Sequence, residues 1–266
     1  MSGRQAAADP LAGRTALVTG AGNGLGRAIS LCLVENGVHT ILVGRDRSKL
    51  AAVAAEAYLS APGLGDPIIE TCDVSDSVEV AALADRLGGV EVSILVNNAG
   101  IAGPVRPLTE ITPEEWDEVF AVNVRSIYLM CHAFLPAMVS RGAGDVINIA
   151  SVSGKRPLVN RTPYAASKMA VLGLTATLAF ETGPSGINVN TLSPGPVDGA
   201  RMQRNFRLAA ELAGTTYEAA EQEFVSRAAL GRMVTEREVG LAAVAMLRMP
   251  GLCGADIDLS AGMIAR

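Results

Sequence analysis

The chain has 266 residues, of which 49% are hydrophobic and 18% are charged. This length and composition support a substantial buried core and exclude a largely disordered protein. Lys and Arg number 22 against 27 Asp and Glu, which gives a formal net charge of −5. Because the basic residues form no cluster, nucleic acid is not an expected partner.

Compartment and membrane association follow from three further features. We find no apolar run long enough to cross a bilayer, and the first ten residues lack a secretory h-region. The four cysteines are scattered without the spacing of a zinc site. We therefore expect a cytoplasmic protein with reduced cysteines, no membrane partner and no bound metal.

Short β-branched runs alternate with longer Ala- and Leu-rich stretches along the whole chain. Strands are predicted at residues 15–19, 40–43, 67–71, 92–96, 145–149, 187–192 and 257–259. Helices are predicted at residues 25–35, 49–59, 78–87, 113–139 and 164–181. Continuously apolar strands are typical of a parallel sheet covered on both faces. The predicted fold is α/β: one domain over residues 1–266, with a doubly wound, mostly parallel seven-stranded sheet of the Rossmann type.

One segment, residues 198–232, interrupts the alternation and is helical in composition. It follows the sixth strand, so it lies at the carboxyl ends of the strands, where open α/β sheets bind ligands. We interpret it as a substrate lid, with a helical hairpin that only packs as the alternative. Arg201, Arg204 and Arg207 recur in it every three residues and could attract an anionic substrate, although a solvated helix face explains them as well.

A glycine-rich turn follows the first predicted strand and opens the first helix. Glycines permit a tight turn and let a diphosphate approach the backbone, where exposed N–H groups and the helix dipole favour an anion. Its position between strand and helix favours a dinucleotide site over an ordinary turn. The expected cofactor contacts in this turn are Gly20, Asn23, Gly24, Leu25 and Gly26.

The end of the second strand indicates which dinucleotide is bound. An NAD site places a carboxylate there for the ribose 2′-OH, but the equivalent position is Gly44, followed by Arg45. A guanidinium suits a 2′-phosphate, so NADP(H) is favoured and NAD(H) remains possible. Asp46 could neutralise Arg45 or bind the ribose itself. Asp73, after the third strand, could bind the adenine amino group or cap the following helix.

Four side chains are candidates for a catalytic site that acts on a carbonyl group. Tyr164 and Lys168 lie four residues apart on one helix face. An ammonium about 4 Å from a phenolate stabilises it by roughly 4 kcal/mol at an effective dielectric of about 20, which suits a tyrosine to acid–base catalysis. Ser151 follows the fifth strand and could polarise the carbonyl oxygen. Asn123, on an apolar helix side, is either a structural residue or part of a proton relay.

These motifs together resemble the short-chain dehydrogenase/reductase family in its compact single-domain form, from about residue 13 to residue 262. They are TGxxxGxG at 19–26, NNAG at 97–100, Asn123, Ser151, YxxxK at 164–168 and PG at 194–195. The resemblance implies a catalytic tetrad of Asn123, Ser151, Tyr164 and Lys168. In it, Lys168 also holds the nicotinamide ribose, and Asn123 positions a water that relays protons to Lys168.

The resemblance also implies the remaining cofactor contacts. Residues 97–100 end the fourth strand and could line the cofactor cleft. The full expected set beyond the glycine turn is Arg45, Asp73, Val74, Asn98, Ala99, Gly100, Tyr164, Lys168, Pro194, Gly195 and Val197. Two positions depart from the family pattern: Gly199 replaces a usual threonine, and residues 260–262 read Ser-Ala-Gly.

The expected function is NAD(P)-dependent oxidoreduction, with hydride transfer between a carbonyl (ketone or aldehyde) and a secondary alcohol. Tyr164 would serve as general acid/base. The alternatives are an NAD-linked alcohol dehydrogenase that works in the oxidative direction and a non-catalytic nucleotide-sensing protein of the same fold. The expected partners are a small-molecule substrate and further copies of the chain, because the resemblance implies a homotetramer packed through the Tyr164 helix and the carboxyl-terminal strand.

Overall fold

The computed structural model describes residues 9–264, without the side chains of residues 200, 201, 205, 208 and 212. Its centre is a seven-stranded sheet in the order β3-β2-β1-β4-β5-β6-β9, and every neighbouring pair is parallel. The strands are β1 (Thr15–Thr19), β2 (His39–Gly44), β3 (Ile68–Thr71), β4 (Ile94–Asn97), β5 (Gly144–Ile149), β6 (Ile187–Pro194) and β9 (Asp256–Leu259). All seven predicted strands are present, so the predicted α/β fold is confirmed.

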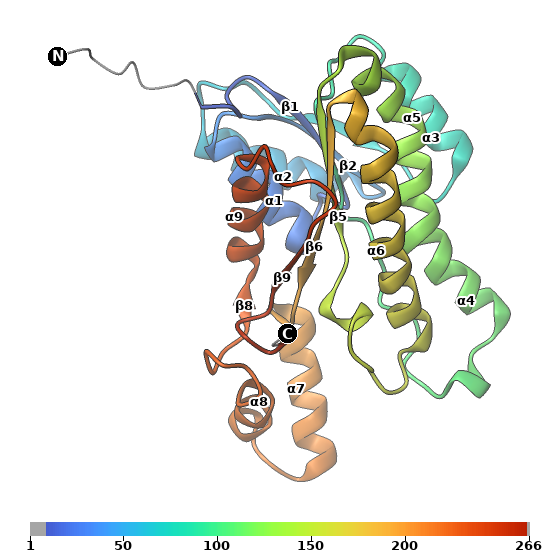
Figure 1. Cartoon of the computed structure of the whole chain (residues 1–266). Helices are drawn as coiled ribbons and strands as arrows, with labels where there is room; N and C mark the ends of the chain where they lie inside the picture. The colour runs from blue at the N-terminus through green and yellow to red at the C-terminus, as the bar shows by residue number, and fades with distance from the viewer. Residues whose placement is uncertain (1–8, 265–266) are drawn as a thin grey trace.

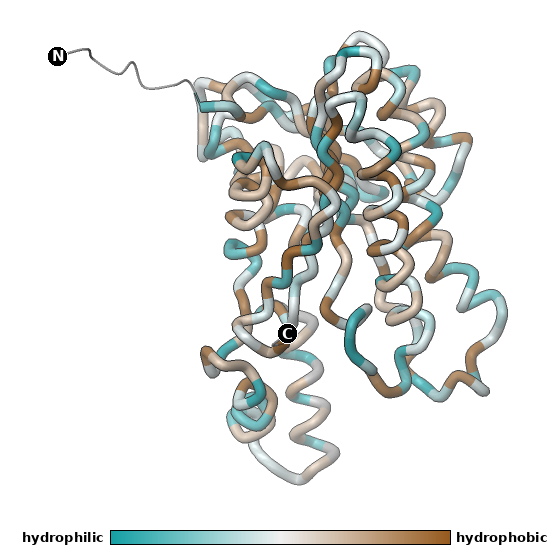
Figure 2. Tube along the Cα trace, viewed as in Figure 1, coloured by the Kyte–Doolittle hydropathy of each residue, from teal (hydrophilic) through white to brown (hydrophobic). Residues whose placement is uncertain are grey.

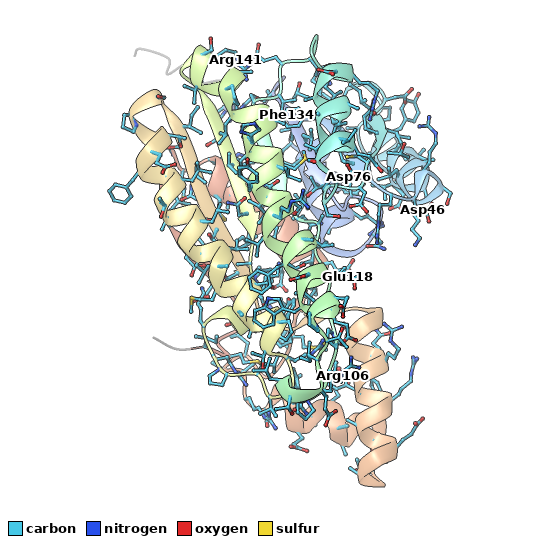
Figure 3. All side chains as sticks on the ribbon, turned by 90° about the vertical axis from the view of Figure 1, so that its right-hand side faces the viewer. Asp46, Asp76, Arg106, Glu118, Phe134 and Arg141 are labelled. Carbon is cyan, nitrogen blue, oxygen red and sulfur yellow. The ribbon has the colours of Figure 1, made fainter. Side chains whose placement is uncertain are left out.

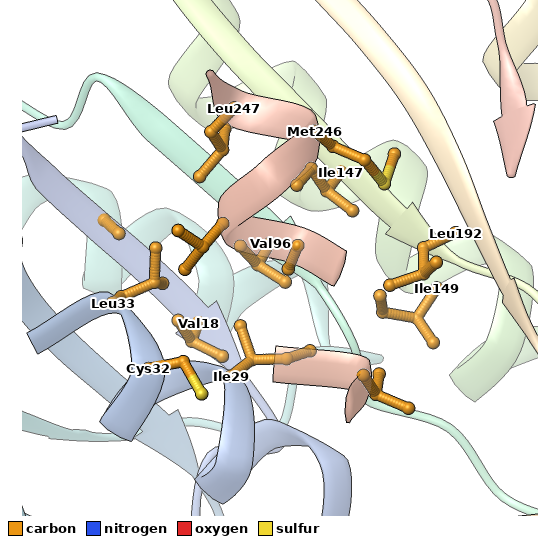
Figure 4. Packing of buried hydrophobic residues seen from close by; sticks show 14 of the residues in the cluster. Val18, Ile29, Cys32, Leu33, Val96, Ile147, Ile149, Leu192, Met246 and Leu247 are labelled. Carbon is orange, nitrogen blue, oxygen red and sulfur yellow. The ribbon is translucent and has the colours of Figure 1, made fainter. Parts of the chain in front are cut away.

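Helices cover both faces of the sheet, which explains why its strands are apolar throughout (Figure 1). One face carries α1 (Gly24–Glu35), α2 (Arg47–Ser60) and α9 (Glu236–Leu247). The other carries α3 (Ser77–Arg86), α5 (Ser126–Arg141) and α6 (Thr162–Thr182). Figure 2 shows hydrophobic residues gathered along the central strands. On the α1–α9 face, Val18, Val96 and Ile147 of three neighbouring strands pack against Ile29 and Met246 (Figure 4).

Aspartates fix the starts of two helices at one end of the molecule (Figure 3). Asp46 accepts hydrogen bonds from the backbone N–H groups of Ser48 and Lys49 at the start of α2. Asp76 does the same for Val78 and Glu79 at the start of α3. Such caps satisfy N–H groups that have no partner within the helix.

The single helix predicted at residues 113–139 is three helical segments. They are α4 (Pro113–Phe120), a π-helical turn η2 (Ala121–Arg125) and α5. Residues Pro113–Arg141 contain an 18-residue stretch of mean hydropathy 1.3, so by length and composition alone this helix could cross a membrane, although Asn123 and Arg125 interrupt its apolar sequence. This stretch is not the uninterrupted apolar run that the sequence was expected to lack, and the absence of a membrane partner stays a prediction. Half of that 18-residue stretch is buried inside the fold, as in a core helix.

The segment after β6 forms two helices beyond the carboxyl ends of the strands (Figure 1). They are α7 (Ala200–Ala213) and α8 (Tyr217–Val225), joined by a small core of Phe206, Val225 and Met233. Two short strands that were not predicted, β7 (Val197–Asp198) and β8 (Val234–Thr235), pair in parallel at the base of this segment. Their pairing joins the two ends of the helical pair to each other.

Candidate active site

A cavity of about 650 Å³ opens where the strands end. Residues that follow β1, β2, β3, β4 and β5 in turn contribute to its wall, because parallel strands end at the same sheet edge. The lining is Gly20, Asn23, Gly24, Leu25, Gly44, Arg45, Cys72, Asp73, Val74, Asn98, Ala99, Gly100, Ile101, Val122, Ile149, Ala150, Tyr164, Lys168, Val197, Gly199, Arg204 and Glu236.

The glycine turn has the shape of an anion cradle. Gly20 has φ +65°, in the left-handed region that favours glycine. A Cβ on Gly26 would lie 2.2 Å from the carbonyl oxygen of Gly20, so only glycine fits there. The amide of Asn98 donates to Thr19 O at 2.9 Å, which joins the turn to the end of β4. The backbone N–H groups at the start of α1 are thus held at the point where the strand order reverses.

The part of the cavity that follows β2 and β3 carries an exposed guanidinium. The Arg45 side chain is 72% exposed, and its Nη1 lies 4.0 Å from a carboxylate oxygen of Asp73. Asp46 uses Oδ1 to cap α2 and lies 3.5 Å from Lys49, so it does not neutralise Arg45. Asp73 accepts from the Ser75 hydroxyl and N–H, and these bonds, helped by Arg45, hold the pKa of Asp73 below its usual value.

Tyr164 and Lys168 both face the cavity from the first turns of α6. The Lys168 ammonium lies 5.9 Å from the centroid of the Tyr164 ring and donates to the Ile149 carbonyl at 2.8 Å. Lys168 is buried, so its charge is weakly screened. The helix therefore delivers a phenol and an ammonium to one wall of the cavity, as their spacing predicts.

Asn123 lies behind that wall and is fully buried. Its Oδ1 accepts from Ile101 N at 2.7 Å, and its Nδ2 donates to Ile101 O and to the Ser167 hydroxyl, both at 3.0 Å. Ser167 in turn donates to the carbonyl of Tyr164 at 2.8 Å. The side chain of Asn123 thus connects the cavity-lining residue Ile101 to the helix that carries Tyr164. The π-helical turn directs it there, and such turns are frequent at functional sites.

Ser151 follows β5 directly and begins the short helix η3 (Val152–Gly154). Its hydroxyl accepts from Ser153 N at 3.1 Å, and its side chain is buried. Its neighbours Ile149 and Ala150 line the cavity. The structure thus places Ser151 beside the cavity, at the carboxyl edge where it was expected.

Several expected residues lie next to the cavity without lining it. In the described part of the chain these are Asn123, Ser151, Gly26, Pro194 and Gly195. Gly26 allows the tight turn. Gly195 packs against Ser260, and a Cβ on Gly195 would lie 2.7 Å from the Cβ of Ser260. Asn97, expected with its neighbours to line the cleft, points into the core and donates to Asn148 at 2.8 Å. This correction follows from the alternation of side chains along a strand.

Some cavity residues were not predicted as site residues. Glu236 begins α9, and a Cβ on Gly199 would lie 3.2 Å from its carboxylate oxygen. Three arginines were considered above for an anionic substrate. Of these, Arg204 lines the cavity from α7, Arg207 is exposed, and the side chain of Arg201 lies outside the described residues. Cys72 also lines the cavity, but burial raises the pKa of its thiol to about 11. A thiol with that pKa is neutral near pH 7 and a poor nucleophile.

Comparison with known proteins places this arrangement in a family. The family model described as short chain dehydrogenase matches residues 14–211. A ketoacyl reductase named for the granaticin polyketide synthase of Streptomyces violaceoruber is 39% identical over 231 residues, covering 84% of this chain and 82% of that protein. The 3-oxoacyl-[acyl-carrier-protein] reductase of Vibrio harveyi is 37% identical over 188 residues, covering 71% and 75%.

A solved structure shows the same architecture. The crystal structure of a variant actinorhodin polyketide ketoreductase with NADPH has a TM-score of 0.86 and 30% identity to this chain. The similarity covers 94% of this chain and 97% of that one. The resemblance thus extends over both the sheet and the helices that follow β6.

Proposed function

Because the chain belongs to the short-chain dehydrogenase family, we propose that it is an NADP(H)-dependent oxidoreductase that interconverts a carbonyl compound and a secondary alcohol. The observation that carries this proposal is the meeting of Tyr164, Lys168 and the glycine turn in one cavity. A nucleotide-binding protein without catalysis would not require a phenol beside a buried ammonium at that place.

Two features of the cavity support the proposal of a dinucleotide with a 2′-phosphate. Gly26 lets the turn close tightly, because a Cβ there would meet the Gly20 carbonyl oxygen at 2.2 Å. Gly24 and Leu25, at the start of α1, line the cavity, where their N–H groups would meet a diphosphate. Arg45 is exposed at the other end, and Gly44 leaves room where an NAD site has a carboxylate. When bound, the cofactor supplies or accepts the hydride.

The protein's own residues then handle the proton and the oxygen. Tyr164 gives its phenolic proton to the carbonyl oxygen in the reducing direction and takes it back in the oxidising direction. Lys168 stabilises negative charge on the phenol oxygen by Coulomb attraction within a buried environment. Ser151 donates a hydrogen bond to the developing oxyanion. Asn123 holds Ile101 and α6 in register and so keeps this wall rigid.

The relatives suggest the substrate class to test first. Two are named as reductases of ketoacyl groups, one of them on an acyl carrier protein, and a levodione reductase structure is 31% identical with a TM-score of 0.85. We propose that the substrate is a ketone carried on a longer molecule. Arg204 of α7 lines the cavity and would meet an anionic carrier group.

The decisive assay follows NADPH oxidation with a panel of ketones, including a 3-oxoacyl thioester and cyclic diketones. The wild type should turn over with at least one of them, and Tyr164→Phe should lower kcat by about 10²–10⁴-fold while its Kd for NADPH stays the same. NADPH binding without turnover on either the ketone or the alcohol panel would favour the nucleotide sensor. Faster turnover with NAD⁺ and alcohols would favour the oxidative dehydrogenase.

Cofactor choice is tested separately with Arg45→Ala. We expect the KM for NADPH to rise up to about fivefold and the KM for NADH to stay unchanged, because an exposed ion pair such as an Arg–phosphate contact contributes up to about 1 kcal/mol. Arg47→Ala, which removes an exposed charge outside the cavity lining, is the matched control. Equal effects of both variants would contradict the role of Arg45.

We also propose a homotetramer in the cytoplasm. Exposed apolar side chains recur eleven residues apart on two helices of one face: Tyr128 and Val139 on α5, and Met169 and Phe180 on α6. Eleven residues make three helical turns, so each pair lies on one stripe. Phe180 is 86% exposed, which is costly for an aromatic ring in water. Light scattering should give four subunits, and Phe180→Glu should reduce that number.

A further inference from the structure

A buried lysine follows the segment that begins with Ser151. The Lys155 side chain is 1% exposed, and its ammonium forms ion pairs with the carboxylates of Asp256 and Asp258 on β9. Asp256 also accepts from the Ser193 hydroxyl of β6 at 2.7 Å. The connection between β5 and α6 is thus anchored on the last strand of the sheet.

The chain between Ser151 and Lys155 is short and closely held. Gly154 N donates to Ser151 O, and Lys155 N donates to Val152 O, both at 3.0 Å. A Cβ on Gly154 would lie 2.9 Å from the backbone carbon of Lys168, so the segment packs directly on α6. It is fixed on one side by that contact and on the other by the ion pairs of Lys155.

The energetic cost of this arrangement points away from a role in stability alone. Removing an ammonium from water is expensive, and a buried ion pair is often no more stable than apolar side chains of the same volume. What two carboxylates provide instead is a defined direction for the lysine and therefore for the backbone that carries it. In this structure that backbone is four residues from the hydroxyl expected to polarise the substrate.

We propose that Lys155, held by Asp256 and Asp258, is a positioning residue that fixes the Ser151 hydroxyl toward the reacting carbonyl. The inference rests on the proposed function, because it assigns Ser151 a role in the reaction. It adds a residue that touches neither substrate nor cofactor and acts through Ser151. It also gives the carboxyl-terminal strand a part in catalysis.

The test is a double-mutant cycle on the full chain with the best ketone of the panel. Lys155→Met should lower kcat about 10–100-fold, as a displaced catalytic group does, and leave the Kd for NADPH unchanged. In a Ser151→Ala background the same change should have little further effect on kcat, because the group it positions is gone. Lys155→Arg, which keeps the charge, should recover part of the activity.

The control is Arg14→Met, which breaks a similar part-buried pair with Asp145 near the start of β5, far from the cavity. It should lower Tm without changing kcat. If Lys155→Met does not fold, the triple variant that adds Asp256→Asn and Asp258→Asn removes the unpaired carboxylates and takes its place.

The outcomes separate the two proposals. An active wild type whose kcat is unchanged by Lys155→Met, or falls equally with and without Ser151, overturns the positioning role. A wild type that reduces no carbonyl compound in the panel overturns the proposed function itself.

Discussion

Replacing Asn123 with alanine should damage both stability and catalysis. The change leaves Ile101 N–H and Ile101 C=O without their buried partner and removes one hydrogen bond from Ser167. An orphaned polar group that is fully buried costs about 1–3 kcal/mol, so roughly 2–6 kcal/mol is the upper range for the two part-buried backbone groups of Ile101. A water that enters the small void would reduce this, and we expect about 2–4 kcal/mol.

The catalytic effect follows from what Asn123 holds. Ile101 lines the cavity, and Ser167 bonds the carbonyl of Tyr164. Loosening both should lower kcat at least tenfold, to be measured on folded protein well below its Tm. Asn123→Asp keeps the acceptor for Ile101 N–H but loses both donated bonds, so it should also be impaired.

Asn148→Ala is the matched control, since its buried amide bonds Asn97 and Thr175 at 2.8 and 2.9 Å away from the cavity. Urea unfolding and steady-state kinetics should show both alanine variants destabilised, with kcat reduced mainly at Asn123. If Asn123→Ala costs under about 0.5 kcal/mol, or if both variants keep wild-type kcat, the assigned role is wrong.

Three further predictions address the cofactor turn, the thiols and a helix cap. Gly26→Ala should raise the Kd for NADPH at least tenfold, because its Cβ would displace backbone of the turn; an unchanged Kd by fluorescence titration would contradict this. Burial raises the pKa of Cys131 to about 12, so iodoacetamide at pH 8 should modify exposed Cys253 first, as peptide mass mapping would show. Bonds from Arg232 and the helix cap lower the pKa of Glu238 from 4.5 to about 2. The Tm difference between wild type and Glu238→Gln should therefore be present at pH 7 and shrink as the pH falls from 4.5 toward 2.

The sheet and the Tyr164 helix could be predicted from local patterns. Apolar runs define buried strands, and a four-residue spacing places Tyr164 and Lys168 on one face whatever the rest of the fold does. The prediction that Asn97 lines the cleft was wrong. The side chains of the successive residues Asn97 and Asn98 point in opposite directions, and only the packing shows that Asn98 is the one that faces the cavity.

Other parts of the site depend on contacts between distant parts of the chain. Glu236 follows Thr235 in an ordinary capping box, so its sequence indicates a helix start and nothing about the cavity. The sequence alone indicates only that Lys155 is a charged residue in a loop. The fold brings the carboxylates of Asp256 and Asp258 on β9 to it. The π-helical turn at Asn123 has no sequence pattern that distinguishes it from a regular helix.

Strand β9 pairs with β6 and accepts the N–H of Gly195 on the carbonyl of Leu259 at 2.8 Å. It is synthesised after every residue of the candidate site. On the ribosome, the nascent polypeptide can therefore carry Tyr164, Lys168 and the glycine turn and still lack the strand that holds Lys155 and bonds Gly195. The proposed activity should then begin only when translation has passed β9, well after strands β1 to β4 have emerged.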